Sequence, residues 1–245
     1  TRYCFLDDTV NESEEKIQGL ADIVQSLPFK LEWTGYNRLD LIWSRQNTIQ
    51  LLKDSGLRTT FFGIESFHPK ASMDVGKGWN GKLAKPFLLE LREKWNNITW
   101  TLGFIAGLTG ETTEDLDNTV SWCIDNKMYC WKFTGLSINR TSSKAYSSEF
   151  ETEYEKYGYS FEGEKNMSKW KNDLWTFDSA QSYASLLDRR SRKFITPGAF
   201  TVSELINDGY SYDQLMYKKN IDLSWGIFEE KTKVFLEKYV KFQLS

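Results

Sequence analysis

Short apolar runs alternate with longer amphipathic segments over the first 140 residues of the chain. Five runs rich in aromatic and β-branched residues, at 3–6, 31–34, 59–64, 99–105 and 131–136, predict β-strands. The segments between them place apolar residues at helical spacing and predict helices over 13–26, 45–55, 82–95 and 113–126. Strand starts roughly 25–40 residues apart are typical of βαβ units, which build a parallel sheet.

The pattern changes after residue 140. Residues 142–172 are polar and rich in Glu and Tyr, which predicts a long loop, and later periodic segments predict helices over 174–192, 201–207, 211–218 and 221–243. In the last segment Trp225, Phe228, Val234, Phe235 and Val240 are expected to form an apolar stripe that faces the core. We therefore predict an α/β barrel-like domain over 1–140, and a loop with a helical extension packed on it over 141–245.

Composition narrows the class of protein. The chain has 245 residues, a net charge of −3 and 40% hydrophobic residues, which excludes disorder of the whole chain and gives no signature of general nucleic-acid binding. No run of about 20 apolar residues is present, so no transmembrane helix is predicted. Three cysteines without CxxC spacing indicate small buried hydrophobes in a reducing compartment, and we expect a cytoplasmic protein.

The single histidine, His68, precedes Pro69 and is interpreted as a loop residue. A histidine-based triad or a histidine-rich zinc site would need this residue, and no recognisable motif surrounds it. Hydrolase and zinc-enzyme functions are therefore disfavoured.

Polar residues follow every predicted strand. Because ligands of parallel α/β folds bind at the carboxyl ends of the strands, these residues predict a binding site. Simpler interpretations stay open for each: a helix N-cap for Asp7 and Asp8, a surface ion pair for Arg38 and Asp40, and a cap for Glu65. The full set is Asp7, Asp8, Arg38, Asp40, Glu65, Ser66, the glycine-rich segment 103–111, Ser137 and Asn139.

Four motifs occur in a characteristic order: Phe-Leu-Asp-Asp-Thr at 5–9, Arg-Leu-Asp at 38–40, Phe-Gly-Ile-Glu-Ser at 62–66 and Gly-Phe-Ile-Ala-Gly-Leu-Thr-Gly-Glu-Thr at 103–112. Their order and spacing resemble the radical SAM superfamily, from the second barrel strand onward, and in particular the branch often fused to a cobalamin-binding domain. The resemblance covers residues 3–139.

The resemblance implies a partial (β/α)6 TIM-like barrel that binds S-adenosylmethionine (SAM) at its C-terminal mouth. It implies a [4Fe–4S] cluster that donates one electron to SAM, which then yields a 5′-deoxyadenosyl radical for modification of an unknown substrate. An electron donor such as flavodoxin or ferredoxin, and cobalamin held by an upstream domain, belong to the same expectation. The substrate class is left open.

The resemblance also assigns roles to residues. Asp7 and Asp8 match the segment that meets the SAM amino group, and Arg38 is a plausible partner of the SAM carboxylate. The remaining matches are Glu65 and Ser66 near the ribose, Ile105 and Gly107 against the adenine, and Ser137 and Asn139 at the end of the last strand.

The chain departs from the superfamily pattern in one respect. The defining CxxxCxxC loop is missing, and Cys4, Cys123 and Cys130 are not spaced to replace it. Because the chain begins at Thr1 inside an apolar run, we expect a fragment that lacks the first βα unit, with the cluster cysteines upstream and no activity alone. The alternative is a degenerate, non-catalytic barrel that acts as a binding or assembly module. Another TIM-type enzyme is disfavoured because no general acid/base pair or metal cluster is evident beyond Asp7 and Asp8.

Overall fold

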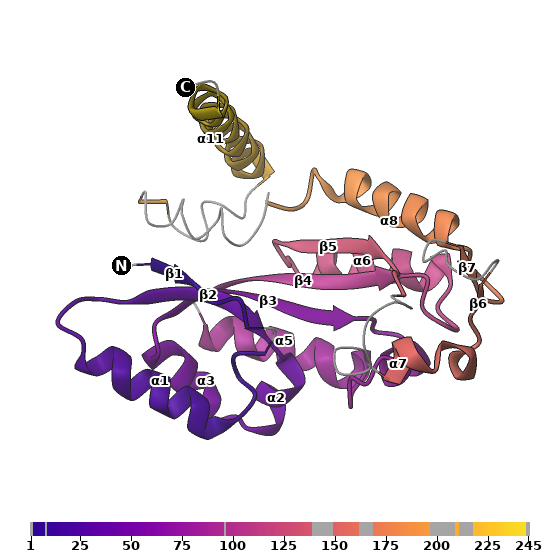
Figure 1. The fold of residues 1–245 in the computed structure, drawn as a ribbon, viewed down its shortest axis with the longest axis horizontal. Helices are drawn as coiled ribbons and strands as arrows, with labels where there is room; N and C mark the ends of the chain where they lie inside the picture. The colour runs from indigo at the N-terminus through magenta and orange to yellow at the C-terminus, as the bar shows by residue number, and fades with distance from the viewer. Residues whose placement is uncertain are drawn as a thin grey trace.

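The structure, a computed structural model, describes residues 2–7, 9–95, 97–138, 149–161, 169–196, 209–210 and 218–243. Five strands form one parallel sheet in the order β1-β2-β3-β4-β5, curled into a half-barrel (Figure 1). Their bounds are β1 (Arg2–Cys4), β2 (Glu32–Asn37), β3 (Leu57–Glu65), β4 (Thr99–Ala106) and β5 (Trp131–Gly135). The predicted α/β partial barrel with a C-terminal helix is confirmed.

Strand β2 is longer than predicted. The sequence predicts a strand over 31–34 and a loop from Gly35, but β2 continues to Asn37, which pairs with Phe62 of β3. Asn37 can lie in a buried ladder because its side-chain nitrogen donates to Thr60 Oγ1 at 2.9 Å. The Asn37 side-chain oxygen is buried without a hydrogen-bond partner among the described residues, so the amide is only half satisfied, yet the polar residues of this segment do not end the strand.

Four predicted helices are confirmed. They are α1 (Glu14–Ser26), α3 (Thr48–Asp54), α5 (Gly81–Lys94) and α6 (Thr113–Asp125). Figure 1 shows α1, α3 and α5 on the convex side of the sheet. Ser13 caps α1 as expected, since its hydroxyl accepts from the Lys16 amide at 3.2 Å.

Two short helices were not predicted. Helix α2 (Leu39–Ser44) follows β2, and α4 (Pro69–Asp74) follows β3. At 6 residues each, they are too short to show a periodic pattern. His68 is therefore an N-cap and not a plain loop residue, because its Nδ1 accepts from the Ala71 amide at 3.4 Å.

Aromatic side chains fill the space between the sheet and the helices that cover it. Phe62 stacks on Trp95 with ring centroids 6.2 Å apart, and Phe104 stacks on Phe133 at 5.2 Å. These four rings are almost fully buried. The packing on this side leaves the concave side of the sheet free to carry polar side chains, because successive strand residues point to opposite faces.

The segment predicted as one loop over 142–172 is partly structured. It contains α7 (Glu149–Thr152), the 3₁₀ helix η1 (Tyr154–Tyr157) and an antiparallel pair of β6 (Ser160–Phe161) with β7 (Trp170–Lys171). The loop prediction is wrong for these residues because a few aromatic contacts, such as Tyr159 on Trp170 at 5.3 Å, hold short elements that show no periodicity.

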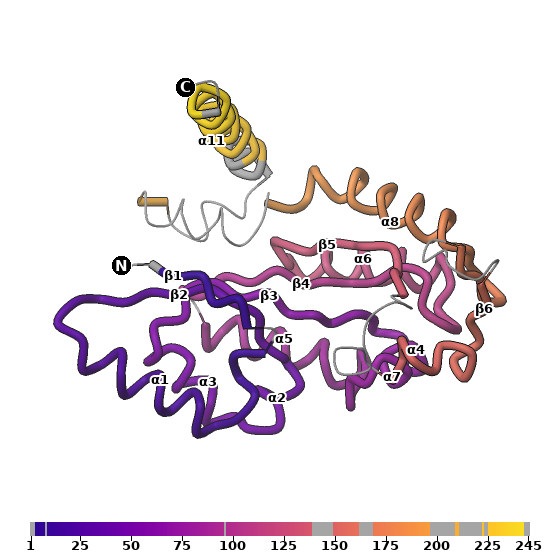
Figure 2. Tube along the Cα trace, in the orientation of Figure 1, coloured from indigo at the N-terminus to yellow at the C-terminus, as the bar shows by residue number. Residues whose placement is uncertain are grey.

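Two helices follow. Helix α8 (Phe177–Ser191) lies along β5 and β4, and α11 (Lys218–Gln243) lies on the opposite side of the sheet from α1 and α3 (Figure 2). The helices predicted over 201–207 and 211–218 fall almost entirely outside the described residues. Within the part of the chain that the structure describes, no helix is long and apolar enough to cross a membrane.

Two burial predictions are wrong. On α11, Val234, Phe235 and Val240 are 43%, 65% and 51% exposed, because this end of the helix extends beyond the sheet. Cys4 is exposed because β1 is an edge strand, whereas Cys123 and Cys130 are buried as expected.

Candidate functional site

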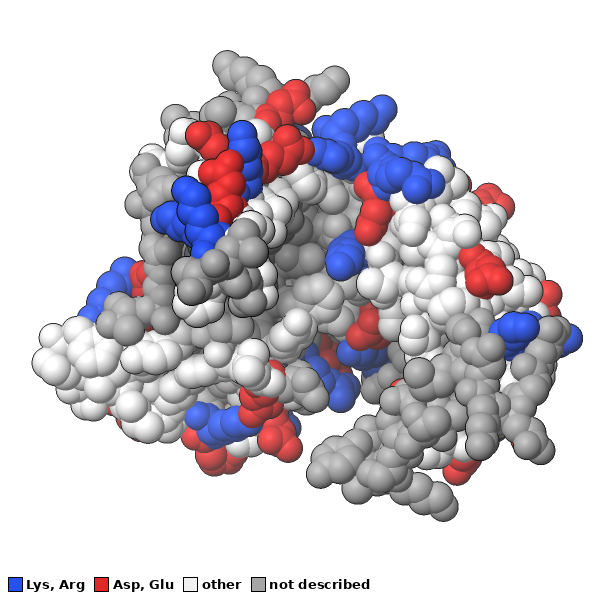
Figure 3. Space-filling model, turned by 45° about the horizontal axis from the view of Figure 1, so that its top comes forward, with Lys and Arg blue, Asp and Glu red and all other residues white. Residues whose placement is uncertain are grey.

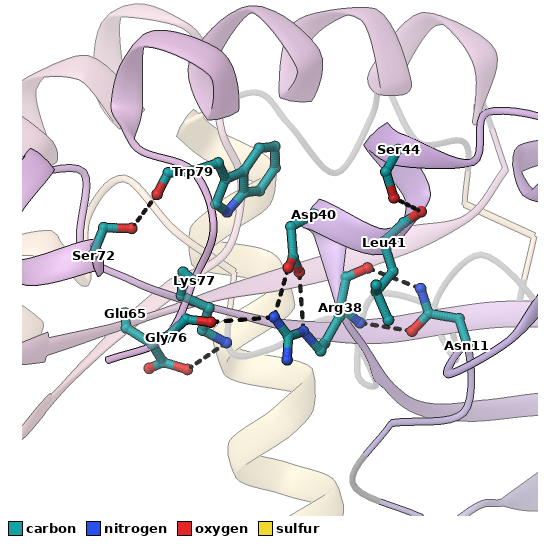
Figure 4. A network of polar contacts seen from close by, with 10 residues as sticks. All are labelled: Asn11, Arg38, Asp40, Leu41, Ser44, Glu65, Ser72, Gly76, Lys77 and Trp79. Atoms are coloured by element: carbon teal, nitrogen blue, oxygen red, sulfur yellow. Dashed lines mark hydrogen bonds and ion pairs between the residues drawn. The ribbon is translucent and has the colours of Figure 1, made fainter. Parts of the chain in front are cut away.

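Arg38 is held firmly at the carboxyl end of β2. It is the N-cap residue of α2, and its backbone N–H and C=O both bond to the Asn11 side chain, each at 2.8 Å. Its guanidinium donates two hydrogen bonds to the Asp40 carboxylate, from Nε to Oδ1 at 3.1 Å and from Nη2 to Oδ2 at 2.6 Å. Backbone and side chain are thus fixed independently, and the guanidinium plane has a defined orientation (Figure 4).

The loop between α4 and α5 joins Arg38 to the end of β3. Arg38 Nη2 donates to the Gly76 carbonyl at 3.4 Å, and the adjacent Lys77 Nζ lies 3.2 Å from Glu65 Oε1. Figure 4 shows these contacts side by side. We refer to Arg38, Asp40, Glu65 and Lys77 as the charge cluster. Its members come from three segments at the carboxyl edge of the sheet, and their side chains are between 14% and 37% exposed.

Glu65 sits in an unusual backbone conformation. Its φ is +64°, and the register between β3 and β4 shifts between Gly63 and Glu65. The carboxylate folds back over Gly63, where an added Cβ would lie 2.3 Å from Glu65 Oε1. Only glycine leaves room for this arrangement, and a bulge with a left-handed non-glycine residue is a feature found next to functional sites.

The charge cluster is balanced, with two cations and two carboxylates. The bond to Asp40 raises the pKa of Arg38, so the guanidinium stays charged. Arg38 Nη1 donates to no residue in the described part of the chain, and only one Glu65 oxygen is paired. The free Arg38 nitrogen can donate to the anionic group of a small zwitterion, and the unpaired Glu65 oxygen can accept from its cationic group. The cluster can therefore bind such a molecule.

Ser66 belongs to a different cluster. Its hydroxyl donates to Glu111 Oε1 and accepts from the His68 amide at 2.8 Å. Glu111 is 1% exposed, and its Oε2 has no partner among the described residues. Burial raises the pKa of Glu111 to about 8, so the carboxyl is mostly neutral at pH 7. The sequence places Glu111 in the glycine-rich segment but gives no sign that it is buried.

Gly107 is covered by the segment that follows β5. Its φ is +105°, and an added Cβ would lie 2.7 Å from the Trp170 ring. Its carbonyl accepts from Tyr159 Oη at 2.9 Å and from Asn172 Nδ2 at 3.1 Å. Ile105 is half-buried on the concave side of β4. The structure therefore gives Gly107 a packing partner and leaves Ile105 partly accessible.

The remaining predicted residues lie apart from the charge cluster. Asp7 bonds to Lys16 Nζ at 2.7 Å, and this bond lowers the pKa of the Asp7 carboxyl. The pair lines a separate cavity of about 370 Å³ between β1 and α1. Ser137 is exposed after β5, while Asp8 and Asn139 lie outside the described residues. Of the predicted site residues, the structure brings Arg38, Asp40 and Glu65 together, and it adds Lys77, which no strand-end pattern marks.

The described residues do not fit an iron–sulfur cluster. No group of three or more His, Cys, Asp and Glu side chains in the described ranges could hold a metal ion. Cys4 is on the edge strand, Cys123 is within α6, and Cys130 immediately precedes β5. No chemical step through a cluster is therefore derived from this chain.

Comparison with known proteins gives a sequence relative of limited extent. No family model matches the chain. A curated protein from Pyrococcus horikoshii, an uncharacterized methyltransferase, is 27% identical over 126 residues, which is 48% of this chain and 25% of that protein. The matched region thus spans about a quarter of the relative's length.

Several solved structures align with part of this chain. The methyltransferase TsrM from Kitasatospora setae, with cobalamin and a [4Fe–4S] cluster, aligns at a TM-score of 0.43 and 15% identity over 55% of this chain and 27% of its own. Coproporphyrinogen III oxidase (HemN) from Escherichia coli aligns at 0.42 and 14% over 62% and 39%. The cobalamin-dependent enzyme OxsB aligns at 0.41 and 18% over 50% and 19%. These neighbours are radical SAM enzymes.

TsrM and OxsB are cobalamin-linked radical SAM enzymes. The overlap is confined to about half of this chain, at TM-scores below 0.5.

Proposed function

We propose that the charge cluster binds the amino-acid end of S-adenosylmethionine and that this chain is part of a radical SAM enzyme. One observation carries the proposal: two cations and two carboxylates from three segments meet at the carboxyl edge of a parallel half-barrel. SAM has an ammonium and a carboxylate on one carbon. A balanced cluster with a free Arg38 nitrogen supplies a partner for each.

In this proposal Arg38 Nη1 donates to the SAM carboxylate, and the free oxygen of Glu65 accepts from the ammonium. Asp40 and the Gly76 carbonyl already fix the guanidinium plane, so little side-chain entropy is lost on binding. Glu65 replaces Asp7 as the proposed ammonium partner, because Asp7 is paired with Lys16 in the separate cavity. Asp8 and Asn139 keep the roles that the resemblance implies.

The concave face below the cluster supplies the apolar part of the site. Ile105 lies there, half-buried, and provides a surface for the adenosine. SAM, when bound in such an enzyme, supplies a 5′-deoxyadenosyl radical, whereas the protein binds, orients and excludes water. The iron–sulfur cluster, cobalamin and an electron donor such as flavodoxin or ferredoxin are proposals for the whole protein, as is methyl transfer, which the name of the Pyrococcus horikoshii relative suggests.

Equilibrium dialysis of the 245-residue chain against labelled SAM tests the proposal. Arg38→Ala is expected to weaken SAM binding by about 1.5–3 kcal/mol, the range for a hydrogen bond between charged groups. Arg58→Ala is the matched control, because Arg58 pairs with Glu32 near the opposite end of the sheet. Adenosine, which lacks the amino-acid end, is expected to bind both variants equally.

Two results would contradict the proposal. Equal SAM affinity of wild type and of both Arg38→Ala and Glu65→Gln would remove the charge cluster from the role. Complete absence of SAM binding would favour the non-catalytic binding module.

A further inference from the structure

A second cavity lies on the concave face, below the charge cluster. Its volume is about 550 Å³, and its lining includes Phe61, Lys132, Asp188, Arg189, Arg192 and Trp225. In the strand register Lys132 pairs with Gly103, and Gly103 pairs with Gly63, two residues before Glu65. The cavity therefore begins one layer of side chains below the carboxyl edge. Figure 3 shows this side of the molecule hollowed, with Lys and Arg as well as Asp and Glu side chains around the hollow.

The cavity wall is cationic. Lys132, Arg189 and Arg192 stand against a single carboxylate, that of Asp188. Asp188 is already engaged, since its Oδ1 accepts from the Phe133 amide at 2.9 Å. The side chains of Lys132 and Arg189 form no hydrogen bond or ion pair within the described ranges, and both residues are exposed, while the charge of Lys132 acts on Asp188 without a direct contact. An anion in the cavity would thus meet two cationic side chains that are not held in an ion pair within the described ranges, and Asp188 is the one carboxylate of the lining beside Lys132.

Two aromatic rings, those of Phe61 and Trp225, line the cavity beside Thr101 and Thr196. Phe61 covers the backbone of Gly103, where an added Cβ would lie 2.3 Å from the ring. Trp225 is oriented by a bond from Nε1 to the Ile195 carbonyl at 2.9 Å, and the Arg192 guanidinium lies 4.6 Å from the centre of its ring. Fixed aromatic surfaces beside free cations are complementary to a molecule with a planar body and one anionic end.

We propose that this cavity is the substrate site and that it takes a small organic anion, a carboxylate or phosphate ester, with a planar apolar body. Lys132 and Arg189 would bind the anionic end, while Phe61 and Trp225 would contact the body. That the bound anion is a substrate rests on the proposed function, whereas the binding of the anion itself does not. A molecule held there would reach upward to the level of Gly63, directly below the charge cluster.

Isothermal titration of the full 245-residue chain with 2-naphthoate, 2-naphthyl phosphate and the neutral 2-naphthamide tests this inference. We expect at least one of the anions to bind at least tenfold more tightly than the amide, and the stronger of the two identifies the preferred anionic group. In the double variant Lys132→Gln, Arg189→Gln, the affinity for that anion is expected to fall at least tenfold. Arg190→Gln is the control, because Arg190 lies on the same helix, pairs with Asp117 and does not line the cavity.

Equal binding of acid, ester and amide, or unchanged affinity in the double variant, would overturn the proposal. Loss of binding in Arg190→Gln as large as in the double variant would also overturn it. The weaker anion binding would then follow from the lower positive charge of the protein and not from contacts in the cavity. SAM affinity measured on the same samples separates the two proposals. Anion binding without SAM binding leaves the cavity assignment intact and removes the proposed function.

Discussion

Lys77 Nζ lies 3.2 Å from Glu65 Oε1, although one residue ends β3 and the other sits between two glycines in the loop after α4. The pair fixes that loop against the sheet edge at the point where Gly76 also contacts Arg38. The loop therefore acts as a bridge between the two strand ends that carry the charge cluster.

Lys77→Met is expected to lower SAM affinity about tenfold, because Glu65 loses its partner and the loop loses its anchor to the sheet. Lys70→Met is the control, since Lys70 pairs with Asp74 on the exposed side of α4. Dialysis with labelled SAM measures both variants. Equal affinities for the two variants would show that the loop has no part in binding.

The stability of the protein is expected to depend on pH through Glu111. Its pKa is raised from the ordinary 4.5 to about 8 in the folded state, so the folded state binds the proton more tightly than the unfolded state. This contribution is fully present below pH 4.5 and is lost as pH rises towards 8, at up to about 1.4 kcal/mol per pH unit.

Urea unfolding at several pH values checks this dependence. Glu111→Gln is expected to flatten the profile between pH 4.5 and 8, because the amide cannot ionise. Glu114→Gln, in the exposed first turn of α6, should leave the profile of the wild type unchanged. A profile of Glu111→Gln parallel to that of the wild type would contradict the assignment.

Gly107→Ala is expected to destabilise the fold by a few kcal/mol. The residue has φ of +105°, and the new Cβ would lie 2.7 Å from the Trp170 ring and 2.9 Å from the Ala180 side chain. Gly19→Ala is the opposite case, because Gly19 is within α1 and nothing lies within 4 Å of the added Cβ. That change should stabilise by up to about 1 kcal/mol. Thermal unfolding of both variants measures the difference.

Thiol labelling is expected to distinguish the three cysteines. Cys4 is exposed, Cys130 is buried, and Cys123 is both buried and held protonated because burial raises its pKa. Ellman's reagent should therefore label one thiol per native chain rapidly and the other two only after unfolding. Cys4→Ser should abolish the fast phase, and a fast phase that persists in this variant would show that a second thiol is accessible.

The parallel sheet could be predicted from the sequence because its signals are local. Alternating apolar runs and helical spacing gave all five strands, although β1 begins one residue earlier than predicted and ends two residues earlier. The short helices α2 and α4 gave no periodic signal, and β2 extends through polar residues because Asn37 finds a buried partner.

The candidate site was harder to predict. Arg38 and Glu65 follow strands, so the rule for parallel sheets places them at one edge. Lys77 follows a helix, and its approach to Glu65 depends on a left-handed turn at Gly76, with φ of +72°. Asp7 follows a strand, but its carboxylate forms an ion pair with Lys16 and does not join the charge cluster. The pattern of strand ends does not reveal which partner Asp7 binds.

Asp188 also shapes the far border of the sheet. Its carboxylate accepts the outward-facing amide of Phe133 on β5, and the whole of α8 lies along that strand. A free parallel edge is a template on which another strand can add, in the same molecule or a neighbouring one. Here the Asp188 side chain and α8 cover the β5 border, so another strand cannot pair there. The β1 border is the one on which a further strand can add, and Tyr3 on it is 47% exposed.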